Sequence, residues 1–471
     1  MMSKAIVYSI VGILVALSSC CPPTAPCPEG EKPKTEDKPQ QPGHSFNDVI
    51  FISIDTQRVD RLGVYGYSHD TSPNIDKFAK EAVVFENHHA QAPLTLVSHV
   101  SMMTGLNPVS HGVRSNGTFK LTDAADTLAE RLKGTGYKTS AIISSGVLSP
   151  VFGLNQGFDF YDGNFSENTD KAQTDAANAT DRAIEWMDGR KKDDHIFMFV
   201  HYYDPHPPFE APSRFQFEHS YDAEVAFVDE QIGVLLEHLK KKNRYRDALI
   251  IVTADHGESL KEHNVLGHTL VLFEQTLHIP LLIRFPGAKN KGKKIETLTR
   301  SVDLMPTILS ILDIPFEATI DGVDLMSAFS EGNNLTGLIS YAETFYSPIK
   351  QLHQKSLISN NWKLISFYHL PPGAEAGKLA RVPIVQKWLE ESVNIRLIEN
   401  YTHLMEAIPR GRVLFDLSKD KKEMKDLYFD RTDIASDLEK QLDEVTSPLP
   451  GRTYAPPDYV MEQLRKLGYI R

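Results

Sequence analysis

Short apolar runs alternate with helical stretches along most of the chain. Five of these runs are predicted to be strands buried on both faces, because they are brief and nearly continuous in apolar residues. The five are Asp48–Ile54, Lys138–Ser144, Ile196–Tyr202, Ala248–Thr253 and Pro280–Phe285. Strands and helices in this order favour an α/β fold with a largely parallel sheet and helices on both of its faces.

Two of the helical stretches have clear signals. Ser72–Phe85 begins with a serine that can cap and a proline in the first helical position, and Ile75, Phe78 and Ala79 fall on one face. A second stripe at helical spacing indicates a helix packed against the core, with no chemistry implied. It consists of Val225, Val228, Ile232, Leu235 and Leu239.

The sequence texture changes after about residue 335, which predicts a main domain over residues 48–335 and a smaller part over 336–471. The 471 residues suffice for one large α/β domain and a smaller one. The formal net charge of −12 disfavours a nucleic acid as binding partner, because nucleic-acid-binding proteins present a basic face.

The first 47 residues differ from the rest. Residues 1–20 are predicted to be an export signal, since Lys4 precedes an apolar run, Ala5–Leu17, that is too short to span a bilayer comfortably. The run ends in Leu-Ser-Ser-Cys, which resembles the lipobox of bacterial lipoproteins and implies a lipid on Cys20. A plain secretory signal or an uncleaved anchor is the alternative. Residues 21–47 are rich in Pro, Lys, Glu and Gln and are predicted to be a disordered tether.

The cysteines define both the expected location and the chemistry of the body. All three, Cys20, Cys21 and Cys27, lie in the leader and tether, so the body has no disulfide, no thiolate metal ligand and no cysteine that can be oxidised. The lipoprotein resemblance implies a membrane partner through the N-terminal lipid anchor. Because Cys21 is not the Asp that retains such proteins at the inner membrane, it implies the outer membrane, cell surface or periplasmic face.

Polar motifs follow three of the predicted strands, at Ile54–Asp60, His201–His206 and Thr253–Glu258. Catalytic groups gather where the strands of such sheets end. Carboxylates and imidazoles buried there are costly unless something pairs with them, and a divalent metal is a suitable partner. Asp55 and the Asp255–His256 pair therefore point to a mixed oxygen and nitrogen metal site.

A fourth motif, Ala92–Val113, contains a Thr-Gly pair, a proline and a His-Gly pair in order. It resembles the nucleophile signature of the sulfatase family, in which Cys or Ser is followed by x-Pro-Ser-Arg and then Thr-Gly, Pro and His-Gly. Thr95 stands where a sulfatase has the Cys that is oxidised to formylglycine. Val97 takes the Pro place, Ser98 keeps the Ser, and His99 takes the Arg place.

The four motifs occur in the family's order, and the resemblance extends from about Asp48 to Leu427. It implies a three-layer α/β/α sandwich like that of alkaline phosphatase, with residues 48–335 as the catalytic domain. It also implies a C-terminal subdomain, residues 336–471, in which a small antiparallel sheet packs on the main domain. Asn361–Ile365 and Val413–Leu417 resemble two strands of that sheet.

The resemblance implies a divalent metal held by Asp55, Asp255, His256 and the Thr95 hydroxyl. Sulfatases usually carry a second metal-binding Asp directly after the first, and this chain has Thr56 there. Losing a hard oxygen ligand while keeping an imidazole favours manganese or zinc, with calcium still open.

Threonine changes the expected chemistry, and no formylglycine is expected. A formylglycine hydrate can expel sulfate by collapsing to the aldehyde, whereas an ester on Thr95 must be opened by water. Members of the wider alkaline phosphatase superfamily use a metal-bound Thr on phosphoesters in this way. The sequence also resembles a branch of sulfatase-like bacterial proteins in which Thr and Ser-His replace Cys and Ser-Arg. A phosphoester hydrolase with a metal-bound Thr95 nucleophile is the resulting hypothesis.

Other roles follow from position within the resemblance. His206 and His268 are expected to support the leaving group, and a histidine can donate a proton there near neutral pH. His99 is expected to steady Thr95 or a substrate oxygen. Asn116 and His201 are expected to bind substrate. His111 reads as structural, and Asp204 with His206 and His268 leaves a second metal ion open.

Three alternatives remain open on sequence grounds: a sulfuric ester hydrolase despite Thr95, a transferase that passes the group from Thr95 to a sugar or lipid hydroxyl, and a non-catalytic surface lipoprotein that binds a ligand. The expected partner is a small-molecule, glycan or lipid ester. The pocket walls that choose among these are expected from loops such as Tyr346–Val382.

Overall fold

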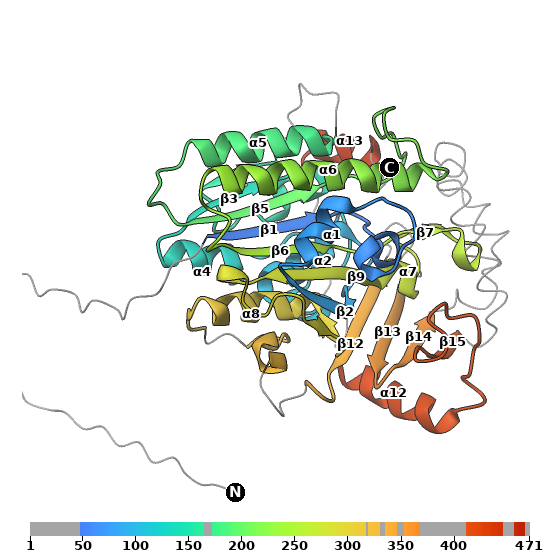
Figure 1. The fold of residues 1–471 in the computed structure, drawn as a ribbon. Coiled ribbons are helices and arrows are strands. Elements are labelled where there is room, and N and C mark those ends of the chain that lie inside the picture. The colour runs from blue at the N-terminus through green and yellow to red at the C-terminus, as the bar shows by residue number, and fades with distance from the viewer. Residues whose placement is uncertain are drawn as a thin grey trace, which may run out of the picture. The chain divides into compact units, whose positions relative to one another are not determined.

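The computed structural model describes residues 48–163, 172–316, 319–329, 335–345, 353–367, 411–445 and 456–466. Its main feature is a nine-stranded sheet in the order β10-β2-β9-β6-β1-β5-β3-β4, with β11 paired to β2 (Figure 1). The strands are β1 (Val49–Ile54), β2 (Val83–His89), β3 (Lys138–Ile142), β4 (Phe160–Asp162), β5 (Ile196–Tyr202), β6 (Leu249–Ala254), β9 (His278–Arg284), β10 (Lys294–Ile295) and β11 (Thr299–Arg300).

The centre of the sheet is parallel, as predicted. β1 pairs in parallel with both β5 and β6, and its last residue, Ile54, is the register partner of Tyr202 and of Ala254. The three strands therefore end side by side, and the residues that follow them meet at one edge. The strand predicted at Pro280–Phe285 is β9, which runs antiparallel to β6 and β2.

Helices cover both faces of this sheet (Figure 1). α1, α5 and α6 pack with Ile50, Ile52 and Ile54 of β1, while α2, α4 and α8 pack with Val49 and Phe51. The helices are α1 (Pro73–Ala79), α2 (Thr95–Thr104), α3 (Pro108–His111), α4 (Leu128–Gly134), α5 (Ala176–Asp188), α6 (Ser220–Lys241), α7 (Glu274–Leu277), α8 (Leu304–Ile311), α12 (Thr432–Val445) and α13 (Asp458–Lys466). The predicted three-layer α/β/α architecture is confirmed.

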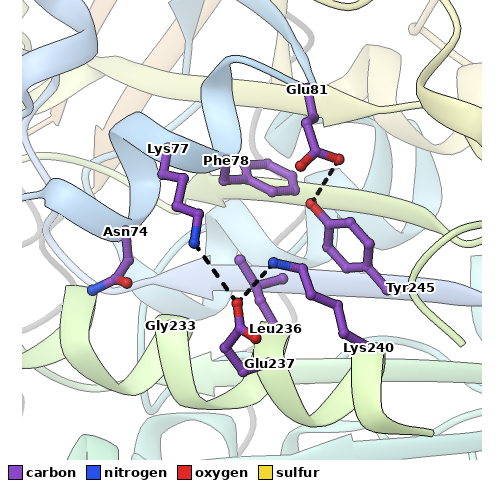
Figure 2. Close-up of a pocket in the computed structure, with 9 residues that line it drawn as sticks. All are labelled: Asn74, Lys77, Phe78, Glu81, Gly233, Leu236, Glu237, Lys240 and Tyr245. Carbon is purple, nitrogen blue, oxygen red and sulfur yellow. Dashed lines mark hydrogen bonds and ion pairs between the residues drawn. The ribbon is translucent and has the colours of Figure 1, made fainter. Parts of the chain in front are cut away.

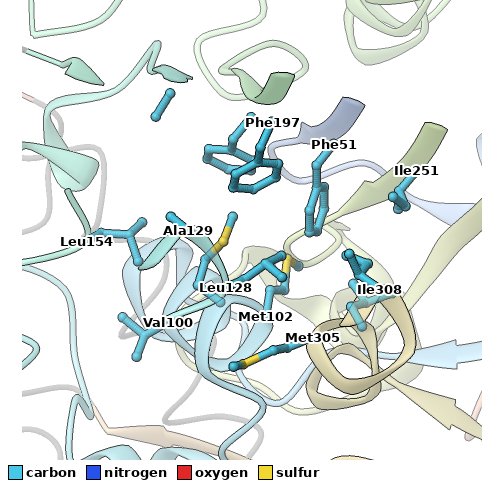
Figure 3. Packing of buried hydrophobic residues seen from close by; sticks show 14 of the residues in the cluster. Phe51, Val100, Met102, Leu128, Ala129, Leu154, Phe197, Ile251, Met305 and Ile308 are labelled. Carbon is cyan, nitrogen blue, oxygen red and sulfur yellow. The ribbon is translucent and has the colours of Figure 1, made fainter. Parts of the chain in front are cut away.

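The core that fixes α2 is built from large apolar side chains (Figure 3). Met102 of α2 lies in one buried cluster with Phe51 and Phe197 of the sheet and with Met305 of α8. Burying each such side chain contributes roughly 1.5–3 kcal/mol, so the helix that begins at Thr95 is firmly seated.

One predicted helix is shorter than expected. The helix predicted over Ser72–Phe85 ends at Ala79, and Val83 already begins β2. β-branched and aromatic side chains from Val83 to Phe85 favour a strand, and they pair there with β9 and β10. The stripe from Val225 to Leu239 does lie on one long helix, α6.

The predicted antiparallel sheet in the C-terminal part is also present. It has the order β12 (Ile339–Phe345), β13 (His353–Ser359), β14 (Trp362–Phe367) and β15 (Arg412–Asp416), and α12 packs against β13 and β14. A two-stranded sheet, β7 (Ser259–Leu260) with β8 (Leu266–Gly267), lies within the main part. Val460 and Leu464 of α13 are buried in the same apolar cluster as α2, α4 and α8, on one face of the large sheet. The exact domain boundary at 335 stays a prediction.

The N-terminal predictions lie outside the described residues. This applies to the signal over residues 1–20, the lipidated Cys20, the tether over 21–47, and most of the loop Tyr346–Val382. Among the helices of the described residues, none has the length and apolar character needed to cross a membrane.

Candidate active site

Four of the predicted site residues meet where the central strands end. Asp55 follows β1, Asp255 and His256 follow β6, and Thr95 is the first residue of α2. All four are fully buried. The parallel register of β1 and β6 brings the two strand ends together, and the packed core holds the start of α2 beside them.

His256 Nε2 lies at the centre of this cluster. It is 3.4 Å from Thr95 Oγ1, 3.4 Å from Asp255 Oδ2 and 3.7 Å from Asp55 Oδ1. The other ring nitrogen, Nδ1, donates a hydrogen bond to the carbonyl oxygen of Gly257 at 3.0 Å. That bond leaves Nε2 with a lone pair directed at the two carboxylates, which is the tautomer a metal ligand needs.

The two carboxylates fit a divalent cation. Both oxygens of Asp55 and Oδ2 of Asp255 are buried without a hydrogen-bond partner among the described residues. Ligand atoms of Asp55, Asp255 and His256 all lie within 4.8 Å of one another. Buried oxygens of this kind are expensive unless they are paired, and two carboxylates with one imidazole form a donor set suited to manganese or zinc and compatible with calcium.

Burial controls the charge of these groups. It raises the pKa of the Asp55 carboxyl to about 8 and that of the Asp255 carboxyl well above its usual range. The nearby Asp55 carboxylate raises the pKa of Asp255 further. It also lowers the pKa of His256 well below its usual value. Such shifts indicate that the cluster is poorly solvated and that a cation would be strongly favoured there.

Backbone groups fix Asp255 in place. Its Oδ1 accepts hydrogen bonds from the N–H groups of Thr56 at 3.1 Å and His256 at 2.8 Å, so Oδ2 is the oxygen left facing His256. Thr56 has a φ of 53°, and its hydroxyl donates to the carbonyl of Pro205. Thr56, which stands at the family's second Asp position, therefore uses its side chain in a hydrogen bond to Pro205. Gly257 is needed because a Cβ there would collide with the carbonyl oxygen of Gln275.

His99 holds the backbone of Thr95 through a hydrogen bond. Its Nδ1 donates to the Thr95 carbonyl at 2.7 Å, and its Nε2 accepts from Ser53 Oγ at 2.8 Å. Burial, with the neighbouring His201 adding to it, keeps the pKa of His99 well below its usual value. Both ring nitrogens are engaged, which suits the expectation that His99 steadies Thr95 and gives no support to contact with a substrate oxygen.

His201 lies behind Asp55. It is the second-last residue of β5, in register with Ser53 of β1, and its Nε2 is 3.5 Å from Asp55 Oδ2. The side chain is fully buried, and within the described part of the chain neither ring nitrogen makes a hydrogen bond. Burial lowers its pKa to about 3. This position suits a neutral imidazole that orients Asp55, whereas contact with substrate stays a prediction.

His268 and His206 lie on the other side of His256. The His268 ring centroid is 4.5 Å from that of His256 and 5.2 Å from that of His206. His268 Nδ1 pairs with Glu258 Oε2 at 2.9 Å. Burial opposes a charge on His268, but Glu258 outweighs it and the pKa of His268 is raised. Glu258 was not singled out from the sequence, although it stands in the Asp-His-Gly-Glu motif.

Asn116 reaches the start of α2. Its amide oxygen accepts a hydrogen bond from the N–H of Leu96 at 3.0 Å. Its amide nitrogen is buried and has no hydrogen-bond partner among the described residues. A donor beside Thr95 in this state is consistent with the predicted contact to a substrate oxygen.

A second metal ion gains no support from this geometry. Asp204 Oδ2 accepts from the N–H of Ala176 at the start of α5, at 2.8 Å. Within the described residues, the groups close enough to share an ion are Asp55–Asp255–His256 and His99–His201–Asp255, and neither contains Asp204, His206 or His268.

His111 is structural, as expected. Its two ring nitrogens bond to Ser101 Oγ at 3.0 Å and to the N–H of Val113 at 3.1 Å. Burial lowers its pKa to about 3.

A surface pocket between α1 and α6 is separate from this cluster (Figure 2). Its charged side chains are all paired, since Glu237 lies 2.8 Å from Lys240 and 3.9 Å from Lys77, and Glu81 lies 3.2 Å from Arg284 outside the pocket. Tyr245 in the same pocket donates to Glu81 at 3.3 Å. With its charges paired, this pocket offers no chemistry comparable to the buried cluster.

Comparison with known families agrees with the site geometry. A family model described as Sulfatase matches residues 47–314, more than half of the chain. The chain belongs to the sulfatase family. A second model, described as N-sulphoglucosamine sulphohydrolase, C-terminal, matches residues 262–383, which include three strands of the small antiparallel sheet.

Sulfatase-family relatives share limited identity with this chain. It is 25% identical over 341 residues to an ulvan-active sulfatase of Formosa agariphila, covering 62% of this chain and 65% of that protein. It is 22% identical over 426 residues to PehA of Trinickia caryophylli, a multifunctional alkaline phosphatase superfamily protein, covering 64% and 82%.

Solved structures show the same fold. The phosphonate monoester hydrolase of Agrobacterium radiobacter superposes with a TM-score of 0.65 at 19% identity, over 84% of this chain and 95% of that one. A protein solved with its substrate D-glucosamine-2-N,6-O-disulfate superposes with a TM-score of 0.67 at 18% identity, over 85% and 97%.

Proposed function

We propose that this sulfatase-family protein is a metal-dependent ester hydrolase in which Thr95 is the nucleophile and phosphoesters are the substrates. The observation that carries the proposal is the placement of Thr95 Oγ1 3.4 Å from His256 Nε2. His256 Nε2 also faces Asp55 and Asp255, and neither the Asp55 oxygens nor Asp255 Oδ2 have a hydrogen-bond partner among the described residues. A divalent cation held by these residues would lower the pKa of the hydroxyl and neutralise charge on the transferred group.

A phosphoester suits threonine better than a sulfate ester does. Thr95 has a single hydroxyl, so the intermediate is an ester that only water can open. Phosphoryl esters of this kind are common enzyme intermediates. The fold neighbours include a phosphonate monoester hydrolase as well as sulfatases, so the fold is compatible with attack at phosphorus.

In the proposed reaction, Thr95 reacts as the alkoxide, its proton having passed to solvent water before the substrate binds, a loss that a cation held by Asp55, Asp255 and His256 would favour. Thr95 Oγ1 then bonds to phosphorus. The bond from phosphorus to the leaving oxygen breaks, and that oxygen takes a proton from His268. Because His268 Nδ1 is held by Glu258, donation falls to its Nε2. Neutral His268 then takes a proton from water as the water oxygen attacks phosphorus and the bond to Thr95 Oγ1 breaks, which releases Thr95 as the alkoxide that begins the next cycle. His99 orients Thr95, and the Asn116 amide nitrogen donates to an oxygen of the transferred group.

We also propose an exported protein anchored in the outer membrane or at the cell surface through a lipid on Cys20. The support is the leader, in which Lys4 and the apolar run Ala5–Leu17 precede Leu-Ser-Ser-Cys. Metabolic labelling with a fatty-acid probe, compared between the wild type and Cys20→Ala, tests this. Equal labelling of the two would contradict the anchor.

Substrate class is tested by side-by-side assays of an aryl sulfate, a phosphate monoester and a phosphodiester on metal-loaded protein. We expect turnover of phosphoesters and little of the sulfate. The relatives named as sulfatases favour the opposite outcome, a sulfate-ester hydrolase, as the second candidate. Preferred cleavage of the aryl sulfate would decide for it.

Three variants at one position test the nucleophile. Thr95→Ala should lose at least about 10³-fold in kcat, Thr95→Val should do the same at matched volume, and Thr95→Ser should keep part of the activity. Metal content by elemental analysis should stay close to one ion per chain in all of them. Full activity in Thr95→Ala would show that another group is the nucleophile.

A further inference from the structure

The segment Val265–Leu277 carries His268 and lies between the active site and the small C-terminal sheet. We propose that this sheet is a positioning device for His268, with Thr344 of β12 and Gln354 of β13 as the positioning residues. The role of His268 as proton donor rests on the proposed function. The positioning of His268 by the sheet rests on the geometry of the hydrogen bonds alone.

Two neighbouring strands hold consecutive carbonyl groups of the segment. The Thr344 hydroxyl donates to the carbonyl of Thr269, and the Gln354 amide donates to the carbonyl of Leu270. Thr344 and Gln354 are register partners across β12 and β13, so they form one side-by-side pair of donors. Both are nearly fully buried. The carbonyls they hold belong to the two residues that follow His268.

Thr269 is held in an unfavourable backbone conformation. Its φ is 55°, in the left-handed region that a β-branched residue rarely adopts. A residue stays there only when its surroundings hold it. The N–H of Thr269 donates to the carbonyl of Pro93 at 3.2 Å, two residues before Thr95. The same residue therefore joins the C-terminal sheet to the loop that leads into the nucleophile.

The far end of the segment is anchored to the same sheet. Lys363 of β14 is fully buried and lies 2.8 Å from Glu274 at the start of α7 and 2.9 Å from Glu423. Glu423 in turn accepts from the N–H of Glu274 at 2.6 Å. An apolar cluster lies between these two anchors and contains Val271, Leu272 and Phe273 of the segment with Ala342, Ile365, Phe367, Val413 and Phe415.

These contacts give the sheet a specific task. With Glu258 holding the imidazole and the sheet holding the two following carbonyls, His268 has little freedom to move away from His256. A proton donor that is misplaced by about 1 Å can lose on the order of 10²-fold in rate. Loosening the Thr269 carbonyl should therefore affect the step in which the leaving oxygen needs a proton, and leave metal binding unchanged.

The test compares Thr344→Val, which removes the donor at constant volume, with Thr344→Ser, which keeps it. Phosphodiesters with a phenyl and a 4-nitrophenyl leaving group are assayed in parallel, since 4-nitrophenolate departs without protonation. Thr139→Val is the matched control, because this buried hydroxyl also donates to a loop carbonyl, that of Gly157 at 2.8 Å, far along the sheet.

We expect Thr344→Val to lower kcat about tenfold for the phenyl ester and within about twofold for the 4-nitrophenyl ester, with KM and metal content unchanged. Thr344→Ser should restore the phenyl ester rate, and Thr139→Val should lower both rates equally or not at all. Equal losses on both esters in Thr344→Val would overturn the positioning role.

Hydrogen–deuterium exchange separates this proposal from the proposed function. Peptides that cover Val265–Phe273 should exchange faster in Thr344→Val than in the wild type or in Thr139→Val, whatever the substrate is. Unchanged exchange would contradict the positioning device. Faster exchange in a protein that hydrolyses no phosphoester would leave the device standing and remove the assigned reaction.

Discussion

His201→Phe is the most informative perturbation of the proposed metal site. His201 is fully buried with its Nε2 3.5 Å from Asp55 Oδ2, and neither group has a hydrogen-bond partner among the described residues. We therefore expect a His201 N–H to orient Asp55 once that carboxylate holds the proposed metal. Phenylalanine keeps a planar aromatic ring, slightly larger than imidazole, and removes both nitrogens. Loss of such an orienting group typically costs 10–100-fold in metal affinity, which is about 1.4–2.7 kcal/mol.

The assay is a competition titration of metal-free protein with manganese or zinc against a chromophoric chelator. His201→Gln should recover part of the affinity, because its amide N–H can reach the same carboxylate. His111→Phe is the matched control. It is another buried histidine whose pKa burial lowers to about 3, but it bonds to Ser101 and Val113. It should cost about 1–3 kcal/mol of stability and no metal affinity.

The increase in the free energy of unfolding on metal binding is a second measurement on the same variants. At a free metal concentration 100 times the dissociation constant, a bound ion adds about 2.7 kcal/mol to the free energy of unfolding. That increment should shrink in His201→Phe and persist in His111→Phe. Wild-type metal affinity in His201→Phe would refute the reasoning that His201 orients Asp55.

Two further predictions concern the buried charges that join the C-terminal sheet to α7. Lys363→Met should lower the free energy of unfolding by about 3–5 kcal/mol, because it leaves Glu274 and Glu423 without their cation. Lys419, whose side chain is 81% exposed beside Asp416, serves as the control. Lys419→Met should lower the free energy of unfolding by under about 1 kcal/mol, and equal losses for Lys363→Met and Lys419→Met in urea melts would contradict the assignment. Burial raises the pKa of Glu423 from 4.5 to about 7, so the folded state keeps a proton that the unfolded state loses. Stability should therefore fall as pH rises from about 4.5 to 7, and Glu423→Gln should flatten that slope; an unchanged slope would argue against the shift.

The sequence predicted that Asp55, Asp255, His256 and Thr95 lie together, and the structure places them in one cluster. Both aspartates follow predicted parallel strands, and catalytic groups gather where such strands end. The structure adds the parallel register of β1 and β6, which brings Asp55 and Asp255 together. The spacing of the family's motif predicted Thr95 as a site residue, and the structure places its Oγ1 3.4 Å from His256 Nε2. Local patterns work here because each residue is fixed by the strand or helix it borders.

Long-range contacts account for what the sequence did not predict. Glu258 and His268 are ten residues apart, and their pairing depends on the turn between β7 and β8. The engagement of His99 depends on Ser53, 46 residues earlier in the chain. The helix predicted over Ser72–Phe85 extends too far because the strand partners of Val83–Phe85, β9 and β10, come much later in the chain. Tertiary packing selects such pairings, and local propensity, as at Val83–Phe85, is too weak to identify the partner strands.

The central claim is that Thr95 itself carries the transferred group. The most direct measurement is acid quenching of the metal-loaded enzyme during turnover of a phosphoester, followed by peptide mass spectrometry over Ala92–Val113. The account predicts a phosphoryl adduct on Thr95 that is missing in Thr95→Val and in metal-stripped protein. Rapid turnover with that peptide unmodified in every quench, or an adduct on a different side chain, would contradict it.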